Sequence, residues 1–304
     1  MIAAVCLNPC IDRTVEIDAF VYGGMNRIRA LRNDGSGKGV NVALAAHELG
    51  LEAACIGILP NENAAPVLSR LEDAGCRADF VRVPGGVRVN TKVINREDHV
   101  VTEINESGEL VSADTMQAVI ELVRAWSAKA DILIMTGSLP PGCPADFYKT
   151  LMEACACRCI LDAEGEKLTL GLAAHPFLIK PNQFELEAAL GRALPEPADV
   201  LRGVREMNGD GMAVVSMGAD GAVFSFEGAG WYAPRIPIEA LSTVGAGDCM
   251  VAGMLYALER GMEPVEVFRH GVAGGTAGCM TPGTMLLRKE DFTQQLERVQ
   301  LIKI

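Results

Sequence analysis

The sequence predicts an α/β protein built on a mostly parallel β-sheet that helices cover on both faces. From about residue 35 onward, short apolar segments alternate with segments of helical periodicity, and strands that alternate with helices form parallel sheets. The 304 residues contain no low-complexity tract, linker or clear internal repeat. We therefore expect a single domain over residues 1–304.

The expected core elements follow one another along the chain. A helix is predicted over 38–49 because Val40, Ala43 and Leu44 recur on one side and Gly50 can end it. The other predicted helices are 145–156, 183–190, 198–207, 246–259 and 264–280. The predicted strands are 53–59, 132–136, 157–161, 177–180 and 212–217, followed by a hairpin around 224–232.

Two segments depart from this alternation and predict a second, smaller sheet. Residues 14–31 and 88–105 show strand-like alternation, as in Val89, Thr91 and Val93, and Glu97-Asp98 is typical of a hairpin turn. We expect a β-sheet lid formed by approximately 12–34 and 88–106. A lid of this kind excludes water from a reaction with which hydrolysis competes.

Charge and composition exclude several classes of partner. The formal net charge of −12 repels polyanions, so we expect no nucleic-acid partner and no membrane partner. The first seven residues lack the features of a signal peptide, and no apolar run approaches the ~20 residues of a membrane helix. Ten scattered cysteines in this context predict free thiols and a cytoplasmic location. Cys155, Cys157 and Cys159 lack a second pair or a nearby histidine, so no zinc site is expected.

The strongest chemical signal is the segment TVGAGD at residues 243–248, which opens the predicted helix 246–259. Small residues let the backbone approach a ligand closely, and amide groups at a helix start attract anions. Asp248 in the first turn is placed to accept a proton from an attacking hydroxyl. The alternative is an acid that merely complements the dipole of a glycine-started helix.

Three further segments are weaker signals. Residues 35–41, GSGKGVN, offer backbone amides and one lysine to an anion, although such a loop is equally often structural. Residues 216–221 follow a predicted strand, where they either have a functional role or form only a tight turn. In 179–185, Lys180 and Asn182 could reach phosphate and Glu185 could hold water around Mg²⁺, or Asn182 and Glu185 form a capping box.

Together these segments resemble the ribokinase-like (pfkB) carbohydrate kinases nearly end to end. Residues 245–248 are similar to the second signature of that family, and 35–41 to its first, with Ser36 in place of a glycine. The finer resemblance is to the branch of 1-phosphofructokinases and tagatose-6-phosphate kinases. It is carried by the segments 7–12, 26–27, 102–106 and 137–142.

The resemblance implies a ribokinase-like three-layer α/β/α core with a small β-sheet lid, ATP and Mg²⁺ as cofactors, and a homodimer through the lid. It implies phosphorylation of a ketohexose phosphate, first of all fructose 1-phosphate to fructose 1,6-bisphosphate. Tagatose 6-phosphate, fructose 6-phosphate and an unphosphorylated sugar or nucleoside remain alternatives, as does a sugar-sensing binding protein with a kinase fold. A nicotinamide-linked oxidoreductase would need a G-x-G-x-x-G loop near the first strand, which is absent.

The resemblance also assigns roles to residues. Asp248 is the expected catalytic base, and the anion hole is formed by Gly245, Ala246 and Gly247. The expected substrate-binding residues are Asp12, Arg27, Gly37, Lys38, Asn41, Arg88 and Ser138. The expected ATP-binding residues are Lys180, Asn182, Ser216, Gly218, Gly221, Thr243 and Gly247. Glu185 is expected to order Mg²⁺ through water. The departures from the family pattern are Cys10, Glu164 and Thr276.

Overall fold

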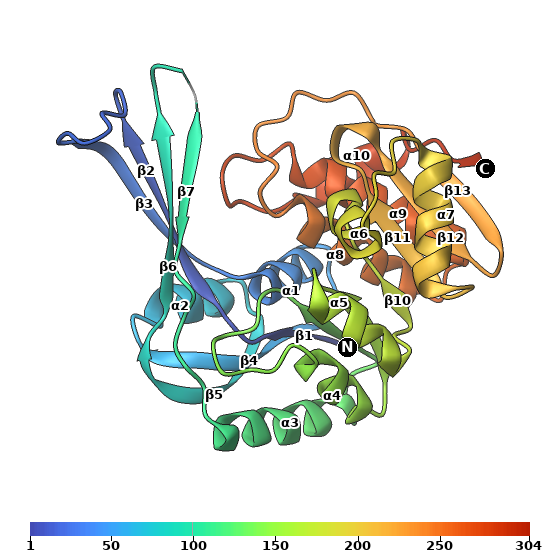
Figure 1. The fold of residues 1–304 in the computed structure, drawn as a ribbon, viewed down its shortest axis with the longest axis horizontal. Helices are drawn as coiled ribbons and strands as arrows, with labels where there is room; N and C mark the ends of the chain where they lie inside the picture. The colour runs from blue at the N-terminus through green and yellow to red at the C-terminus, as the bar shows by residue number, and fades with distance from the viewer. Residues whose placement is uncertain (99) are drawn as a thin grey trace.

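The computed structural model describes residues 1–98 and 100–304, and its larger sheet has ten strands (Figure 1). Their order across the sheet is β14-β13-β12-β11-β10-β9-β8-β1-β4-β5. Neighbouring strands from β5 to β11 pair in parallel, and β12, β13 and β14 continue the sheet antiparallel. The strands are β1 (Ile2–Cys6), β4 (Ala53–Glu62), β5 (Arg77–Gly86), β8 (Ile132–Thr136), β9 (Arg158–Asp162), β10 (Leu178–Ile179), β11 (Met212–Ser216), β12 (Ala222–Phe226), β13 (Ala229–Ala233) and β14 (Ile302–Lys303).

Helices cover both faces of this sheet because alternate strand residues face opposite sides. Ile2, Ala4 and Cys6 of β1 belong to one apolar core, whereas Ala3 and Val5 belong to the other. The first core packs against α1 (Lys38–Glu48), α2 (Ala65–Asp73), α8 (Ala246–Glu259), α9 (Pro264–Gly278) and α10 (Lys289–Leu296). The second packs against α3 (Ala113–Ser127), α4 (Phe147–Glu153), α5 (Glu166–Gly171), α6 (Gln183–Leu190) and α7 (Pro197–Asn208). The predicted three-layer α/β/α core is confirmed.

Most predicted boundaries agree with the structure, and two elements are shorter than predicted. The helix predicted over 145–156 is shorter, since α4 comprises only Phe147–Glu153. The strand predicted over 177–180 is reduced to Leu178–Ile179, although the Phe177 and Lys180 amides donate to the flanking strand β9. The elements β1, β5, β14, α2, α3, α5 and α10 were not predicted.

A separate four-stranded sheet projects from the core beside α1 and α2 (Figure 1). Its order is β3 (Ile28–Ser36), β2 (Cys10–Ile17), β6 (Arg88–Asn95) and β7 (Val101–Asn105). The hairpin that joins β6 and β7 includes residue 99, which lies outside the described residues. We call these four strands the small sheet.

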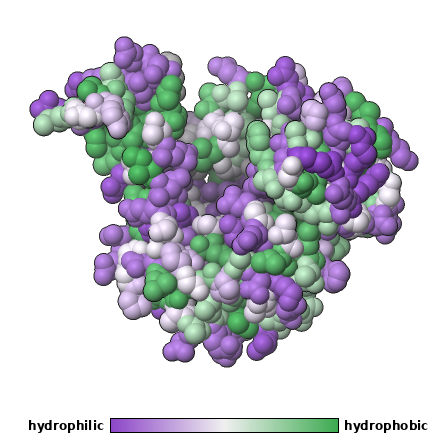
Figure 2. Space-filling model, viewed as in Figure 1, coloured by the Kyte–Doolittle hydropathy of each residue, from purple (hydrophilic) through white to green (hydrophobic). Residues whose placement is uncertain are grey.

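The two faces of the small sheet differ in chemistry. Strand register places Cys10 beside Arg88 and Asp12 beside Asn90 on the face that lines a cavity. The opposite face carries exposed apolar side chains such as Leu31 and Ile104. Figure 2 shows hydrophobic residues gathered on this projecting part of the molecule. None of the helices formed by the described residues has the length and apolarity needed to cross a bilayer.

Candidate active site

The polar residues predicted from the sequence gather where the parallel strands end. Ser138 follows β8, Lys180 follows β10 and Ser216 ends β11. Asp162 is the last residue of β9, between them in the sheet. Parallel strands place their carboxyl ends at one edge, and ligands of open α/β sheets bind beyond that edge.

The segment 243–248 forms a turn that ends in helix α8. Gly245 is the residue before the helix and has a φ of 79°, which favours glycine. Gly245 has no side chain with which to cap the first amides of α8, so a bound anion can satisfy them. Anion binding by this loop stays a prediction, and the glycine at the helix start is the geometry that it requires.

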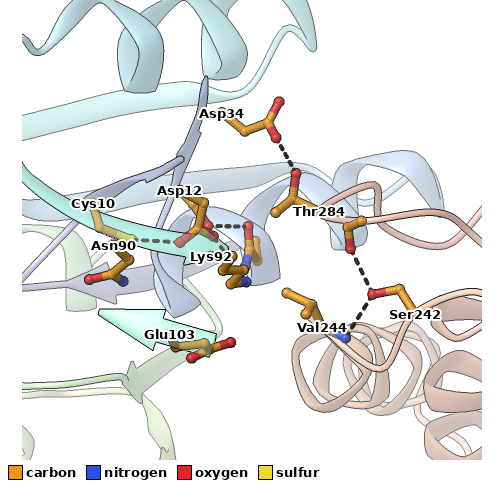
Figure 3. Close-up of polar contacts among 12 residues, drawn as sticks. Cys10, Asp12, Asp34, Asn90, Lys92, Glu103, Ser242, Val244 and Thr284 are labelled. Atoms are coloured by element: carbon orange, nitrogen blue, oxygen red, sulfur yellow. Dashed lines mark hydrogen bonds and ion pairs between the residues drawn. The ribbon is translucent and has the colours of Figure 1, made fainter. Parts of the chain in front are cut away.

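Hydrogen bonds tie this turn to the loop after α9 and to the small sheet (Figure 3). The Ser242 hydroxyl accepts from the Val244 amide at 3.2 Å and donates to the Gly283 carbonyl at 2.9 Å. The next residue, Thr284, donates to Asp34 Oδ2 of β3 at 2.6 Å. The loop after α9 is thereby hydrogen-bonded both to the turn before α8 and to strand β3.

Asp248 is buried in the first turn of α8, with 5% of its surface exposed. Asn41 of α1 donates from Nδ2 to Asp248 Oδ2 at 2.9 Å. Burial raises the pKa of Asp248 to about 7, against the opposing effect of the Lys38 ammonium. A carboxylate that titrates near neutral pH is suited to accept a proton from a hydroxyl group.

A buried cluster of charge centres on Asp162. Its Oδ1 lies 3.1 Å from Lys180 Nζ, and its Oδ2 lies 3.8 Å from Lys38 Nζ. Thr136 Oγ1 also donates to Oδ2, at 2.8 Å. Burial opposes ionisation, yet the two ammonium groups lower the pKa of Asp162 below its ordinary value, and Asp162 in turn raises the pKa of Lys38. Asp162 is therefore a carboxylate at neutral pH.

The small sheet adds a second group of charges, visible in Figure 3. Asp12 is buried, and Lys92 Nζ lies 4.0 Å from its Oδ2. Burial raises the pKa of the Cys10 thiol to about 12, so the thiol is protonated and its Sγ donates to Asp12 Oδ1 at 3.7 Å. Glu103 of β7 lies opposite Lys92 of β6 in the strand register. These side chains line one wall of a cavity of about 370 Å³.

Arg88 sits at the bottom of the small sheet, next to the end of β8. Its Nη2 donates to Ser138 Oγ at 3.3 Å, and its Nε donates to the Asn8 carbonyl at 3.2 Å. These three residues and Lys38 line a recess of about 230 Å³. Guanidinium, ammonium and hydroxyl groups in one recess are a suitable set of donors for a phosphate monoester.

The 370 Å³ cavity continues into a larger one of about 550 Å³. The smaller cavity is lined by Asp12, Gly37, Lys38, Asn41, Lys180, Asn182, Glu185 and Asp248, among others. The larger is lined by Ser216, Gly218, Gly221, Thr243 and Ala246, with apolar side chains that include Ile236, Met250 and Val272. Ser216 and Gly247 line both. The start of α8 therefore stands where the two cavities meet.

The capping-box alternative for Asn182 and Glu185 is present in the structure. Asn182 Oδ1 accepts from the Glu185 amide at 2.8 Å, and Glu185 Oε2 accepts from the Asn182 amide at 2.8 Å. Both residues nevertheless line the cavity, and burial raises the pKa of Glu185. The box thus fixes the Glu185 carboxylate at the rim of the site.

Arg27 is the one predicted substrate-binding residue that the structure places elsewhere. It is exposed in the connection between β2 and β3, at the far end of the small sheet from the recess (Figure 1). Arg27 is not among the residues that line the recess of about 230 Å³ or the cavities of about 370 and 550 Å³. Within one chain Arg27 therefore does not lie beside Lys38 and Arg88, and its substrate-binding role stays a prediction.

Other residues of the site were not singled out from the sequence. Asn90 and Lys92 continue the alternation that begins at Arg88, so three alternate residues of β6 are polar and line the cavity. Asp162 follows a predicted strand, which was a usable signal. Its ion pairs join residues far apart in the sequence, however, and no local pattern shows them.

Close contact between α8 and α9 fixes the position of Asp248. A Cβ at Gly253 of α8 would lie 2.2 Å from the His270 carbonyl oxygen. A Cβ at Gly274 of α9 would lie 2.4 Å from the Cys249 carbonyl oxygen. Only glycine permits this separation, so the backbones of the two helices touch directly.

Comparison with known proteins agrees with this geometry. The sequence profile described as "pfkB family carbohydrate kinase" matches residues 6–290. The 1-phosphofructokinase of Rhodobacter capsulatus is 37% identical over 280 residues, covering 90% of this chain and 88% of the relative. The 1-phosphofructokinase of Bacillus subtilis is 31% identical over 301 residues, covering 97% of each. The structure of phosphofructokinase-2 from Escherichia coli in complex with fructose-6-phosphate superposes with a TM-score of 0.88 at 28% identity, covering 98% of each chain.

Proposed function

This chain belongs to the pfkB family of carbohydrate kinases, and from that premise we propose that it phosphorylates fructose 1-phosphate to fructose 1,6-bisphosphate with ATP. It is a phosphotransferase that acts on a sugar phosphate. The observation that carries the specific proposal is the meeting of two cavities at Gly247, with Asp248 beside the junction. Phosphoryl transfer needs this arrangement, because donor and acceptor must approach in line.

The substrate occupies the polar cavity in this proposal. Its existing phosphate binds in the recess lined by Lys38, Arg88 and Ser138, whose two cationic groups attract an anion although Glu164 also lines the recess. Its hydroxyl groups bind Asp12 and Asn41, and the Gly37 backbone lies alongside them. This orientation leaves the free primary hydroxyl toward Asp248.

The nucleotide occupies the 550 Å³ cavity, with its adenine among the apolar side chains and its phosphates toward Gly247. The ribose and phosphates contact Ser216, Gly218, Gly221 and Thr243. The terminal phosphate lies within reach of Lys180 and Asn182.

The site also fits Mg²⁺. Asn182 engages one oxygen of Glu185, which leaves the other to hold a metal-bound water. The described residues form no group of three or more His, Cys, Asp and Glu side chains able to hold a metal. When bound, Mg²⁺ neutralises charge on the phosphate oxygens.

Asp248 takes the proton of the acceptor hydroxyl as that oxygen attacks the γ-phosphorus of ATP. The bond between the γ-phosphorus and the β–γ bridging oxygen breaks, and ADP leaves. Asn41 holds the carboxylate in place through its 2.9 Å hydrogen bond. The amides of Gly245, Ala246 and Gly247 receive the charge that develops on the transferring group, and each such donor is worth roughly 3–4 kcal/mol when removed.

The small sheet acts as a lid in this proposal. It contributes Asp12, Arg88 and Lys92 to one wall of the site and so excludes water from the reacting groups. Its outer face exposes Leu31 and Ile104, which would be covered if two copies packed their small sheets together. We propose a homodimer of this kind.

A coupled ADP-release assay tests the proposal. Fructose 1-phosphate, tagatose 6-phosphate, fructose 6-phosphate, fructose and ribose are compared at matched ATP, with the Asp248→Asn variant as the control for contaminating kinases. We expect the highest kcat/KM with fructose 1-phosphate. Preference for another ketose phosphate would refute the assigned substrate, and preference for fructose or ribose would refute the phosphate recess. ATP binding without turnover of any sugar would favour a binding protein.

A further inference from the structure

The buried carboxylate of Asp162 has no role in the proposed reaction, yet it stands at the centre of the site. Only 1% of its surface is exposed. One oxygen accepts from Thr136, while no hydrogen-bond donor of good geometry reaches the other, Oδ1, among the described residues. Oδ1 instead faces the Lys180 ammonium at 3.1 Å. A buried charge of this kind is costly unless an opposite charge compensates it.

The two lysines beside Asp162 come from different parts of the fold. Lys38 is the first residue of α1, directly after Gly37, and lines the recess assigned to the substrate phosphate. Lys180 follows β10, and its Nζ lies 3.5 Å from the place of a Cβ on Gly247. One ammonium group thus faces the acceptor and the other faces the loop that receives the transferring group.

We propose that Asp162 is a positioning residue, which holds the ammonium groups of Lys38 and Lys180 on the two sides of the phosphoryl-transfer path. This inference rests on the proposed kinase function. Lysine side chains are flexible, and a shared carboxylate restricts both ammonium groups to the geometry that the reaction needs. Asp162 also offsets the repulsion between two neighbouring cations before the substrates bind.

The same carboxylate acts on the base across the cavity. The charged groups that face Asp248 are Lys38 of α1, Lys180 after β10 and Asp162 of β9. Asp12, Lys92, Glu103 and Glu185 line the same cavity from the small sheet and α6, and Arg88 lies at its floor. Because Asp162 is negative, it favours the protonated form of Asp248, and its neutralisation lowers the pKa of Asp248.

The test replaces Asp162 by asparagine, which keeps the shape and removes the charge. We expect kcat/KM to fall by about 100-fold with respect to both ATP and the ketose phosphate, as when a reacting geometry shifts by about 1 Å. The acid limb of the pH–kcat/KM profile should move to lower pH. The matched control is Asp131→Asn, which makes the same change of charge at the opposite end of the sheet, next to the N-terminal amine. Asp131→Asn should change neither kcat/KM nor the position of the acid limb.

A double-mutant cycle decides whether Asp162 acts through Lys180. Lys180→Met and Asp162→Asn are combined, and the loss in the double variant should be smaller than the product of the two single losses. Multiplicative losses, or an acid limb that stays in place in Asp162→Asn, would overturn the inference. Wild-type turnover of a ketose phosphate tests the proposed function separately, since it does not depend on any variant.

Thr136→Val gives a second route if Asp162→Asn does not fold. This change removes the 2.8 Å hydrogen bond to Oδ2 and preserves the charge and the side-chain volume. A smaller decrease in kcat/KM in the same direction would support the inference. Unchanged kcat/KM for both substrates in a folded Thr136→Val protein would contradict it.

Discussion

Replacing Asp248 by asparagine is expected to stop turnover and, at neutral pH, to make the protein more stable. Asparagine keeps the side-chain shape and can still accept the hydrogen bond from Asn41 Nδ2. It cannot accept a proton from a hydroxyl group, so kcat should fall by about 100- to 10,000-fold, the usual contribution of a general base. Binding of ATP should be largely retained, because Asp248 is not among the residues that line the nucleotide cavity.

The gain in stability follows from the pKa of Asp248. Its value rises from 3.8 in an exposed chain to about 7 in the fold, because burial disfavours the charged carboxylate. Below about pH 4 both states are protonated, and the group has no effect on the free energy of unfolding. Between about pH 4 and pH 7 only the unfolded chain releases the proton, so wild-type stability falls as the pH rises. Above that range the cost is complete, about 4 kcal/mol, and the asparagine variant avoids it.

Urea unfolding of both proteins at a series of pH values measures this difference. Effects of other titrating groups cancel, since the two chains share them. The free energy of unfolding of the variant should exceed that of the wild type by a margin that grows with pH and vanishes near about pH 4. A margin that does not change with pH would refute the reasoning, as would a wild type that is the more stable protein at about pH 8. The acid limb of wild-type kcat/KM should lie near the same pKa of about 7.

Three other changes test separate parts of the structure. Arg88→Ala should raise the KM for fructose 1-phosphate far more than the KM for ATP, and equal effects would contradict the phosphate recess. Gly274→Ala adds a methyl group 2.4 Å from the Cys249 carbonyl oxygen, so the free energy of unfolding should fall by about 1–3 kcal/mol. Gly86→Ala is its control, because nothing lies within 4 Å of the added atom; equal thermal midpoints would refute the close helix contact. Ile104→Asp should halve the mass measured by light scattering, and an unchanged dimer would exclude the outer face of the small sheet as the interface.

The core of the fold was predictable because its signals are local. Helix α8 and strand β8 have the boundaries that periodicity and flanking glycines indicated. The small sheet was predicted from period-two alternation alone, although its position beside α1 and α2 depends on packing that no single segment encodes.

The site was predictable only in part. Asp248 and Lys38 belong to glycine-rich loops whose chemistry is visible in one segment. Asp162 and Lys92 gain their roles from ion pairs with residues elsewhere in the fold, which no single segment of the sequence reveals. Arg27 is the opposite case, since a short motif predicts a substrate-binding role that the position of Arg27 within one chain does not explain.

The glycine contact between α8 and α9 has a consequence for how such a chain can change over time. The carbonyl oxygen of Cys249 and the backbone at Gly274 meet without intervening side chains. Substitutions among the surrounding apolar residues can therefore change the packing of the interior without displacing the carboxylate of Asp248, which directly precedes Cys249. The hydrophobic interior can thus diverge in sequence while the position of Asp248 stays the same. The constraint falls on the contact glycines Gly253 and Gly274, which cannot accept a side chain.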